Sequence, residues 1–149
     1  MEARPARSED LDALTALRGA LFPDHPAAFH RGELEALITR ADYGVFLAVG
    51  ASGPVGFAEV ALRTDYVNGC DTSPVAFLEA VYVAPDQRRG GCARALITAV
   101  EDWGRARGCT ELASDADLAN IDSHRMHAAV GFEETERVVY FRKGLAESR

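Results

Sequence analysis

Glycine and arginine are concentrated between Arg88 and Arg94, just after an apolar run and before a helix-forming stretch. Glycine lets the backbone approach a ligand closely, and the free N–H groups at a helix N-terminus carry partial positive charge. Arg88, Arg89 and Arg94 add mobile positive charge to an otherwise acidic chain. We therefore expect this segment to bind a phosphate group. It is neither a Walker A loop, which requires Gly-Lys-Ser/Thr, nor a GxGxxG dinucleotide motif.

Two carboxylates lie within or directly after predicted buried strands, where charged groups are uncommon. Glu79 lies inside the apolar run Val75–Val83, and Asp115 directly follows the predicted strand 109–114. Burying a carboxylate is costly unless it has a partner, so we expect both side chains to face one cleft and to attract a cation. The alternatives are a structural ion pair for Glu79 and a helix or turn cap for Asp115.

The histidines and cysteines indicate no metal centre. His124 and His127 are three residues apart on a predicted helix, a spacing that can bind metal, but no third ligand is evident. Cys70, Cys92 and Cys109 have no CxxC spacing and are odd in number. This pattern predicts neither a disulfide framework nor a zinc site, and it is typical of a reducing cytoplasm.

The charge and apolar content of the chain limit the classes of partner that it can bind. The formal net charge of −7 disfavours nucleic acid, which proteins bind through basic patches, and favours a cationic small molecule. Simple solubility would give a similar charge. No stretch approaches the ~20 apolar residues of a membrane helix, and the charged N-terminus has no secretory signal, so we expect no membrane association.

The periodicity of apolar residues predicts an α+β fold, a mixed and mainly antiparallel central sheet flanked by helices on both faces. We expect one domain over residues 1–149. The first helix starts at Ser8, acting as its cap, and a last strand contains Val138 to Phe141. In chain order the expected elements are a helix from Ser8, a helix over 30–40, strands 44–49, 55–62 and 75–83, a helix over 92–107, a strand 109–114, a helix from Asn120 or Ser123 to Gly131, and a strand 133–143.

The pattern Arg88-x-x-Gly91-x-Ala93, preceded by Val81-Tyr82-Val83, resembles the pyrophosphate-binding motif of the GNAT superfamily of acyl-CoA-dependent N-acyltransferases. Asn120 and His127-x-x-x-Gly131-Phe132 are similar to that superfamily's second cofactor-contacting segment. The resemblance implies a GNAT fold over nearly the whole chain, with acetyl-CoA as co-substrate and no metal. The implied cofactor-binding residues are Val81, Tyr82, Val83, Arg88, Arg89, Gly90, Gly91, Cys92, Ala93, Arg94 and Asn120.

Longer segments narrow the resemblance to the aminoglycoside 6'-N-acetyltransferases: 65–71, 77–79, 113–115 and 131–137. This family implies a homodimer and acetyl transfer to the 6'-amine of an aminoglycoside, conferring resistance. Relatives commonly have Trp where this chain has Phe22, and superfamily members often have Tyr where it has His127. The implied substrate-contacting residues are Phe22, His25, Tyr66, Glu79, Asp115 and Glu136.

The implied reaction is direct attack of the amine on the thioester within a ternary complex. We expect Asp115 to position the amine and Glu79 to accept its proton through water. The proton for the leaving thiolate comes from His127, Tyr140 or solvent, which the sequence does not decide between. Two alternatives are an acetyltransferase for another small amine or a peptide, and a non-catalytic CoA-binding sensor.

Overall fold

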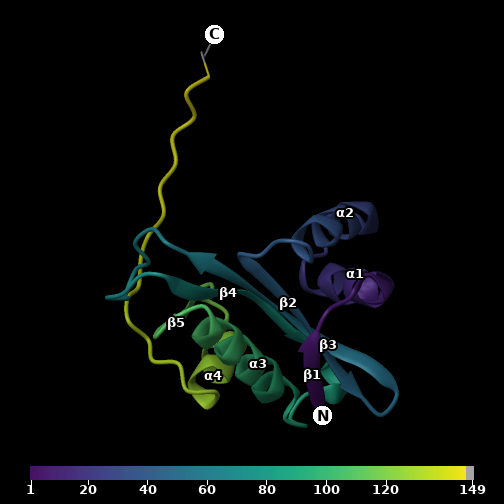
Figure 1. Cartoon of the computed structure of the whole chain (residues 1–149). Coiled ribbons are helices and arrows are strands. Elements are labelled where there is room, and N and C mark those ends of the chain that lie inside the picture. Colours follow the sequence, from purple (N-terminus) through teal and green to yellow (C-terminus); the bar gives the residue numbers. More distant parts are fainter. Residues whose placement is uncertain (147–149) are drawn as a thin grey trace.

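The computed structural model describes residues 1–146 and arranges them as a five-stranded sheet with helices on both faces (Figure 1). The strand order follows the sequence, and every neighbouring pair is antiparallel except β4 and β5, which are parallel. In chain order the elements are β1 (Glu2–Pro5), η1 (Ser8–Asp10), α1 (Leu11–Leu21), α2 (Ala27–Leu37), β2 (Tyr43–Gly50), β3 (Gly53–Arg63), β4 (Val75–Val83), η2 (Pro85–Gln87), α3 (Cys92–Ala106), β5 (Leu112–Ser114) and α4 (Ile121–Ala129).

Strand alternation gives the sheet two buried faces. On one face, Leu96, Val100 and Trp103 of α3 pack against β-strand residues such as Phe46 and Val60. On the other face, α1 and α2 cover a second core, centred on Leu14, Leu34 and Phe57. Successive strand residues point to opposite faces, so each central strand contributes to both cores.

Strand β4 contains a bulge at Glu79. Val60 of β3 is opposite Leu78, whereas the next residue back along β3, Glu59, is opposite Ala80. The extra residue in β4 shifts the alternation, since Leu78 belongs to the α3 core and Ala80 to the α1–α2 core. Bulges of this kind bend a strand and can end its pairing on the other edge.

The pairing of β5 with β4 stops immediately before this bulge. Only three residue pairs connect the two strands, and the last is Leu78 with Ser114. Strand β4 then continues to Val83 with no β5 residue opposite it. The two parallel strands therefore form a fork that opens at Glu79.

Most of the expected elements are present, with boundaries shifted by a few residues. The strand 75–83 matches β4, and the helices expected over 30–40 and 92–107 correspond to α2 and α3. Strand β1 was not expected, and it pairs with β2 from Glu2↔Val49 to Pro5↔Phe46. Its short, charged sequence carries little of the alternation that predicts strands.

Ser8 does not cap the first helix as expected. It begins the 3-10 turn η1, and the Asp10 carboxylate accepts a hydrogen bond from the Arg7 backbone N–H at 2.8 Å. Asp10 also forms a two-pronged ion pair with Arg4 of β1, at 2.7 and 2.9 Å. The hydrogen bond from this guanidinium lowers the pKa of the Asp10 carboxyl. Asp10 is the N-cap residue of α1 by position, but its carboxylate binds the Arg7 main chain and Arg4 and accepts no hydrogen bond from an N–H group of the helix.

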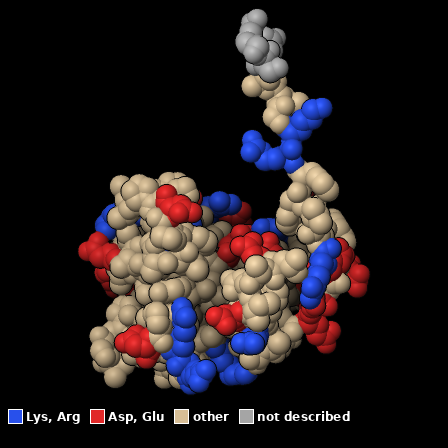
Figure 2. All heavy atoms as spheres, turned by 180° about the vertical axis from the view of Figure 1, so that it is seen from behind, with Lys and Arg blue, Asp and Glu red and all other residues tan. Residues whose placement is uncertain are grey.

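The strand expected over 133–143 is wrong for this chain taken alone. After α4 the backbone runs as an extended tail that leaves the sheet (Figure 1). Tyr140 and Phe141 in this tail are 82% and 91% exposed, in a run of four apolar residues that begins at Val138. In the space-filling view the tail projects from the body and carries basic side chains partway along its length (Figure 2). The apolar pattern is that of a strand, but no strand within residues 1–146 pairs with this segment.

Candidate active site

The turn between β4 and α3 has the backbone geometry of a helix N-terminus open to a ligand. Gly91 is the N-cap residue of α3 and has a φ of 83°, in the left-handed region that favours glycine. Arg89 also has a positive φ, 69°, which is strained for a residue with a side chain. The first intrahelical bond runs from the Ala95 N–H to the Gly91 carbonyl at 3.0 Å. The preceding N–H groups of the first turn are therefore available to an anion.

Arg88 and Arg94 are anchored, whereas the sequence suggested mobile charges. The Arg88 Nε donates to the Val83 carbonyl at 2.9 Å, and its guanidinium lies over the Tyr82 ring. Arg94 donates to the Ala129 carbonyl at the end of α4, at 2.7 Å. Both side chains keep their positive charge near the turn, but they also hold β4, α3 and α4 together.

The main chain of Val81 and Val83 points toward the open side of the fork. The Ala84 N–H donates to the Val55 carbonyl on the β3 side, at 2.8 Å. The Tyr82 carbonyl also faces β3, since it lies against Gly56. Because main-chain groups alternate in direction along a strand, those of Val81 and Val83 face away from β3. The Val83 carbonyl is already bound by Arg88, so Val81 offers the free main-chain groups.

Glu79 is not the buried carboxylate that its apolar neighbours suggested. The bulge leaves it exposed, and its carboxylate accepts a 2.7 Å hydrogen bond from Arg63 in an ion pair. The same Arg63 guanidinium stacks 3.6 Å from the centre of the Phe77 ring. Glu79 thus lies on the face of the sheet that α1 and α2 cover, with a positive side chain already in contact.

Among residues 1–146, the most deeply buried carboxylate is that of Glu59 in β3, which is only 1% exposed. It accepts hydrogen bonds from Arg18 of α1 at 2.8 Å and from the Tyr43 hydroxyl at 2.5 Å. Burial, together with the neighbouring Glu59 charge, raises the pKa of the Tyr43 phenol, which therefore stays a donor. Sequence reasoning missed this network, although an acidic residue between apolar neighbours was the same signal that drew attention to Glu79.

The network extends to the segment between α1 and α2. His30, 1% exposed, faces Arg18 through Nδ1 at 3.3 Å and the Phe22 carbonyl through Nε2 at 2.9 Å. Arginine can only donate, so Nδ1 accepts and Nε2–H donates to Phe22. The His25 ring stacks on Phe29 of α2 with ring centres 4.1 Å apart. Phe22 and His25, both expected to contact substrate, are therefore held by α2 and by the buried Glu59 network.

Asp115 and its neighbours lie at the end of β5. Asp115 is exposed and has no ion pair within the described part of the chain. Ser114 directly before it contacts His127 of α4, with 2.7 Å between Ser114 Oγ and His127 Nε2. The Nδ1 of His127 is 2.7 Å from the Ser123 carbonyl oxygen. The end of β5 thus brings a free carboxylate and a serine–histidine pair together at the fork.

The other α4 residues have local roles. The Asn120 side chain accepts a hydrogen bond from the Ser123 N–H at 3.1 Å and so caps the helix. His124 Nε2 is 2.9 Å from the Asp117 carbonyl. Among residues 1–146, no three His, Cys, Asp or Glu side chains gather as metal ligands.

Tyr66, Glu136 and Tyr140 lie outside the fork. Tyr66 is on the loop between β3 and β4 and is largely exposed. The tail begins against this loop, since Thr135 is so close to Gly69 that a side chain at Gly69 would overlap with it. Glu136 is therefore next to the loop that carries Tyr66, whereas Tyr140 lies farther along the projecting tail.

All three cysteines are free thiols, and Cys92 and Cys109 are buried. Burial raises the pKa of the Cys92 thiol at the start of α3. The thiol therefore stays protonated at neutral pH, whereas nucleophilic attack requires the thiolate. No helix in residues 1–146 has the length and apolar character needed to cross a membrane.

Residues 14–132 match the model of the acetyltransferase (GNAT) family. The chain is 54% identical to an aminoglycoside N(6')-acetyltransferase type 1 from Serratia marcescens, over 92% of this chain and 94% of the relative. A protein of the same name from Salmonella typhimurium is 43% identical over 96% and 99%.

Two solved structures are similar across almost the whole fold. One is AAC(6')-Iy in complex with the bisubstrate analogue CoA-S-monomethyl-acetylneamine, with a TM-score of 0.91, 42% identity and coverage of 96% and 97%. The other is aminoglycoside 6'-N-acetyltransferase AAC(6')-Ih from Acinetobacter baumannii, with a TM-score of 0.92, 45% identity and coverage of 97% and 99%.

Proposed function

Because the chain belongs to the acetyltransferase (GNAT) family, we propose that it transfers the acetyl group of acetyl-CoA to the 6'-amine of aminoglycoside antibiotics and so confers resistance. The observation that carries this proposal is the combination of an anion-binding helix start with an open β4 edge beside it. Relatives of the same activity, more than 40% identical over nearly their full length, support the choice of acceptor.

For acetyl-CoA, main-chain groups are the main binding elements. The backbone N–H groups from Arg89 to Arg94 would hold the pyrophosphate, with the α3 dipole and the anchored charges of Arg88 and Arg94 in support. The pantetheine arm would lie along the open edge of β4, where the Val81 main chain faces the fork. The Tyr82 side chain packs against the α1–α2 core, and its carbonyl faces β3, away from this edge. Asn120, already the cap of α4, would approach the sulfur end of the cofactor.

For the aminoglycoside, the binding elements are side chains on the α1–α2 face. Aminoglycosides are polycations, and Glu79, Asp115 and Glu136 supply exposed carboxylates around the fork and the nearby loop. Phe22 and Tyr66 offer flat apolar surface to sugar rings, and His25 adds a polar group beside Phe22. Arg63 neutralises Glu79 in the free protein, so an incoming ammonium group would compete with it.

The chemistry is a direct transfer in a ternary complex. Asp115, exposed and unpaired within residues 1–146, would orient the amine, and Glu79 would accept its proton through a water molecule. A main-chain N–H near Val81 would polarise the thioester carbonyl as negative charge develops on its oxygen. His127 and Tyr140 stay candidates for the proton that the leaving thiolate needs. An acyl-cysteine route through Cys92 is disfavoured, because its thiol is buried and protonated.

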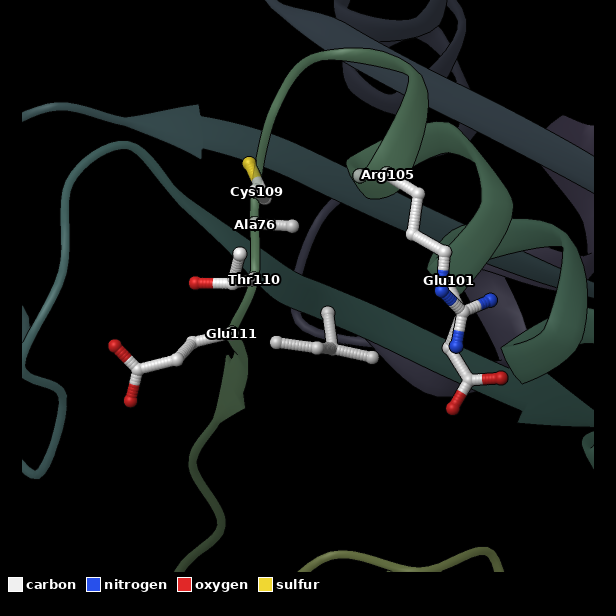
Figure 3. Close-up of a pocket in the computed structure, with 8 residues that line it drawn as sticks. Ala76, Glu101, Arg105, Cys109, Thr110 and Glu111 are labelled. Carbon is white, nitrogen blue, oxygen red and sulfur yellow. The ribbon is translucent and has the colours of Figure 1, made fainter.

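The projecting tail supports assembly as a homodimer. Four consecutive apolar residues from Val138 to Phe141 are exposed, and β5 is an edge strand of the sheet. A cavity of about 190 Å³ lies beside β5, where Glu101 and Arg105 of α3 and Glu111 line an open space (Figure 3). Two chains that exchange tails would cover both the apolar segment and the open strand edge. Tyr140 lies on this tail, so it could serve as proton donor to the thiolate only within such a dimer.

We further place the protein in the cytoplasm and treat residues 1–149 as one domain. The three free thiols support a reducing compartment, and a single family match over residues 14–132 supports one domain there. The absence of a metal requirement is also part of the proposal.

A direct test is the release of CoA thiol from acetyl-CoA over a panel of amines. We expect turnover with kanamycin and none with an analogue that has a 6'-hydroxyl in place of the amine. Turnover with other amines but not aminoglycosides would overturn the proposed acceptor. Tight acetyl-CoA binding without any turnover would instead support a sensor.

A further inference from the structure

Ser114 has a contact that the proposed mechanism leaves unused. Its hydroxyl lies 2.7 Å from Nε2 of His127, and the pair joins the last residue of β5 to the last turn of α4. Nδ1 of the same ring lies 2.7 Å from the Ser123 carbonyl oxygen and 3.3 Å from the Ser123 hydroxyl. Phe132 packs edge-on against the ring, with centroids 5.0 Å apart. The imidazole is therefore fixed in orientation.

These contacts determine where the ring can gain and lose a proton. A carbonyl oxygen only accepts hydrogen bonds, so Nδ1 must carry a hydrogen whether the ring is neutral or charged. Nε2 is then the nitrogen without a fixed hydrogen, and it faces Ser114 Oγ. In the neutral ring Nε2 accepts from the serine hydroxyl, and in the imidazolium it donates to the same oxygen.

The pair lies on the side of the sheet opposite the acceptor residues. Ala113, the residue before Ser114, packs with Phe77 and Val75 on the Glu79 side of the strand. Ser114 points the other way, toward α4, in agreement with strand alternation. Its partner across the strands is Leu78, the last pair before the fork opens. A thioester that reaches the base of the fork would thus meet carboxylates on one side and the Ser114 hydroxyl on the other.

We propose that Ser114 is the catalytic proton donor to the leaving thiolate, with His127 as the group that supplies the proton through it. This inference rests on the proposed acetyl transfer. When the carbon–sulfur bond breaks, its electron pair goes to sulfur, which takes the Ser114 hydroxyl proton. In the same step Ser114 Oγ takes the Nε2 proton of the His127 imidazolium. The products are a CoA thiol, an intact serine and a neutral histidine, which regains a proton from solvent.

The test compares Ser114→Ala, Ser114→Thr, His127→Gln and the Ser114→Ala/His127→Gln double variant. Rates are measured in a single turnover, with enzyme in excess over acetyl-CoA and with kanamycin saturating. We expect Ser114→Ala and His127→Gln each to lose about 10–100-fold, the usual contribution of a general acid. Ser114→Thr keeps the hydroxyl and should retain most of the rate. The double variant should lose no more than the larger single loss, because both residues act in one relay.

A structural role would give a different pattern. If Ser114 and His127 had only a structural role, their variants would have a lower melting temperature and weaker acetyl-CoA binding. Ser114→Thr would then be no faster than Ser114→Ala. A Ser114→Ala rate within twofold of wild type, or losses that multiply in the double variant, overturns the relay. An independent test is nitrogen NMR of the wild-type protein, which reports which ring nitrogen of His127 carries the hydrogen. The relay requires the neutral ring to carry its hydrogen on Nδ1, and the opposite tautomer overturns it.

Failure of the relay and failure of the proposed function are separable, because wild-type turnover is measured first. If the protein acetylates another amine but no aminoglycoside, the acceptor is wrong and the same variants are compared on that amine. If no amine is acetylated, both proposals are overturned.

Discussion

The turn at the start of α3 and the acceptor side of the fork are built in opposite ways. The turn is one continuous stretch, and we propose that it binds the cofactor through main-chain groups, whose direction follows from Gly91 and the helix. The proposed acceptor side collects side chains from five separate segments, and their positions depend on the bulge, on the Glu59 network and on the tail. A main-chain site can thus be recognised from a few neighbouring residues, whereas a side-chain site requires the whole fold.

The largest expected effect is on the acceptor side, from Asp115→Asn. If Asp115 orients the amine, kcat/KM for kanamycin should fall at least about 10–100-fold, because the neutral amide does not attract and hold an ammonium group as the carboxylate does. The dissociation constant of acetyl-CoA should not change. Steady-state kinetics and calorimetric titration of acetyl-CoA measure the two quantities.

Asp117→Asn is the matched control, since Asp117 is exposed in the same connection and only its carbonyl contacts His124. It should stay within about twofold of wild type, as surface changes usually do. Equal losses in both variants would assign the effect to general surface charge.

An intermediate effect is expected at the turn, from Gly91→Ala. A side chain in the left-handed region costs about 1–2 kcal/mol, so the turn should leave this conformation and misdirect its N–H groups. Acetyl-CoA affinity should weaken by about 5–30-fold, with the KM for kanamycin unchanged. Gly90→Ala is the control, because a methyl group there meets only the Gln87 carbonyl at an ordinary 3.6 Å. Similar affinities for the two variants would refute a role for the Gly91 geometry.

The smallest effects concern the pair of Glu79 and Arg63. Glu79→Gln should raise the KM for kanamycin about three- to tenfold without changing acetyl-CoA affinity, because one carboxylate of the acceptor side is lost. It should also lower kcat, because the neutral amide cannot accept the amine proton. Arg63→Gln should lower that KM by up to about threefold, since Glu79 is then free of its competing cation. Changes of the same sign in both variants would mean that the ion pair is structural.

Much of the fold could be predicted because the helices and central strands carry clear apolar periodicity. Strand β4 and the start of α3 were located to the residue. The expected burial of Glu79 failed, because a bulge has no signature in the apolar pattern. Glu59 has the same kind of apolar neighbours in the sequence, yet it is buried and paired with Arg18. Sequence alone could not assign the two carboxylates to their opposite environments.

The site shows the same division. The anchoring of Arg88 and Arg94 by main-chain carbonyls depends on the positions of β4 and α4, which no local motif encodes. Residues 133–143 have the composition of a strand, but composition does not specify whether a sheet edge is available to pair with them. The contact of Ser114 with His127 was likewise missed, since a serine at a strand end is unremarkable until α4 is in place.

The bulge at Glu79 also bears on how β4 tolerates insertion and deletion during evolution. Deletion of Glu79 would remove the bulge and make Leu78 and Ala80 consecutive, as their β3 partners Val60 and Glu59 already are. The positions from Ala80 to Val83 would keep their faces, with Val81 on the α3 core and Tyr82 on the α1–α2 core. A deletion elsewhere in the paired part of β4 would instead turn the residues on one side of it to the opposite face. Position 79 is therefore the place where β4 can lose a residue without exchanging its two buried faces.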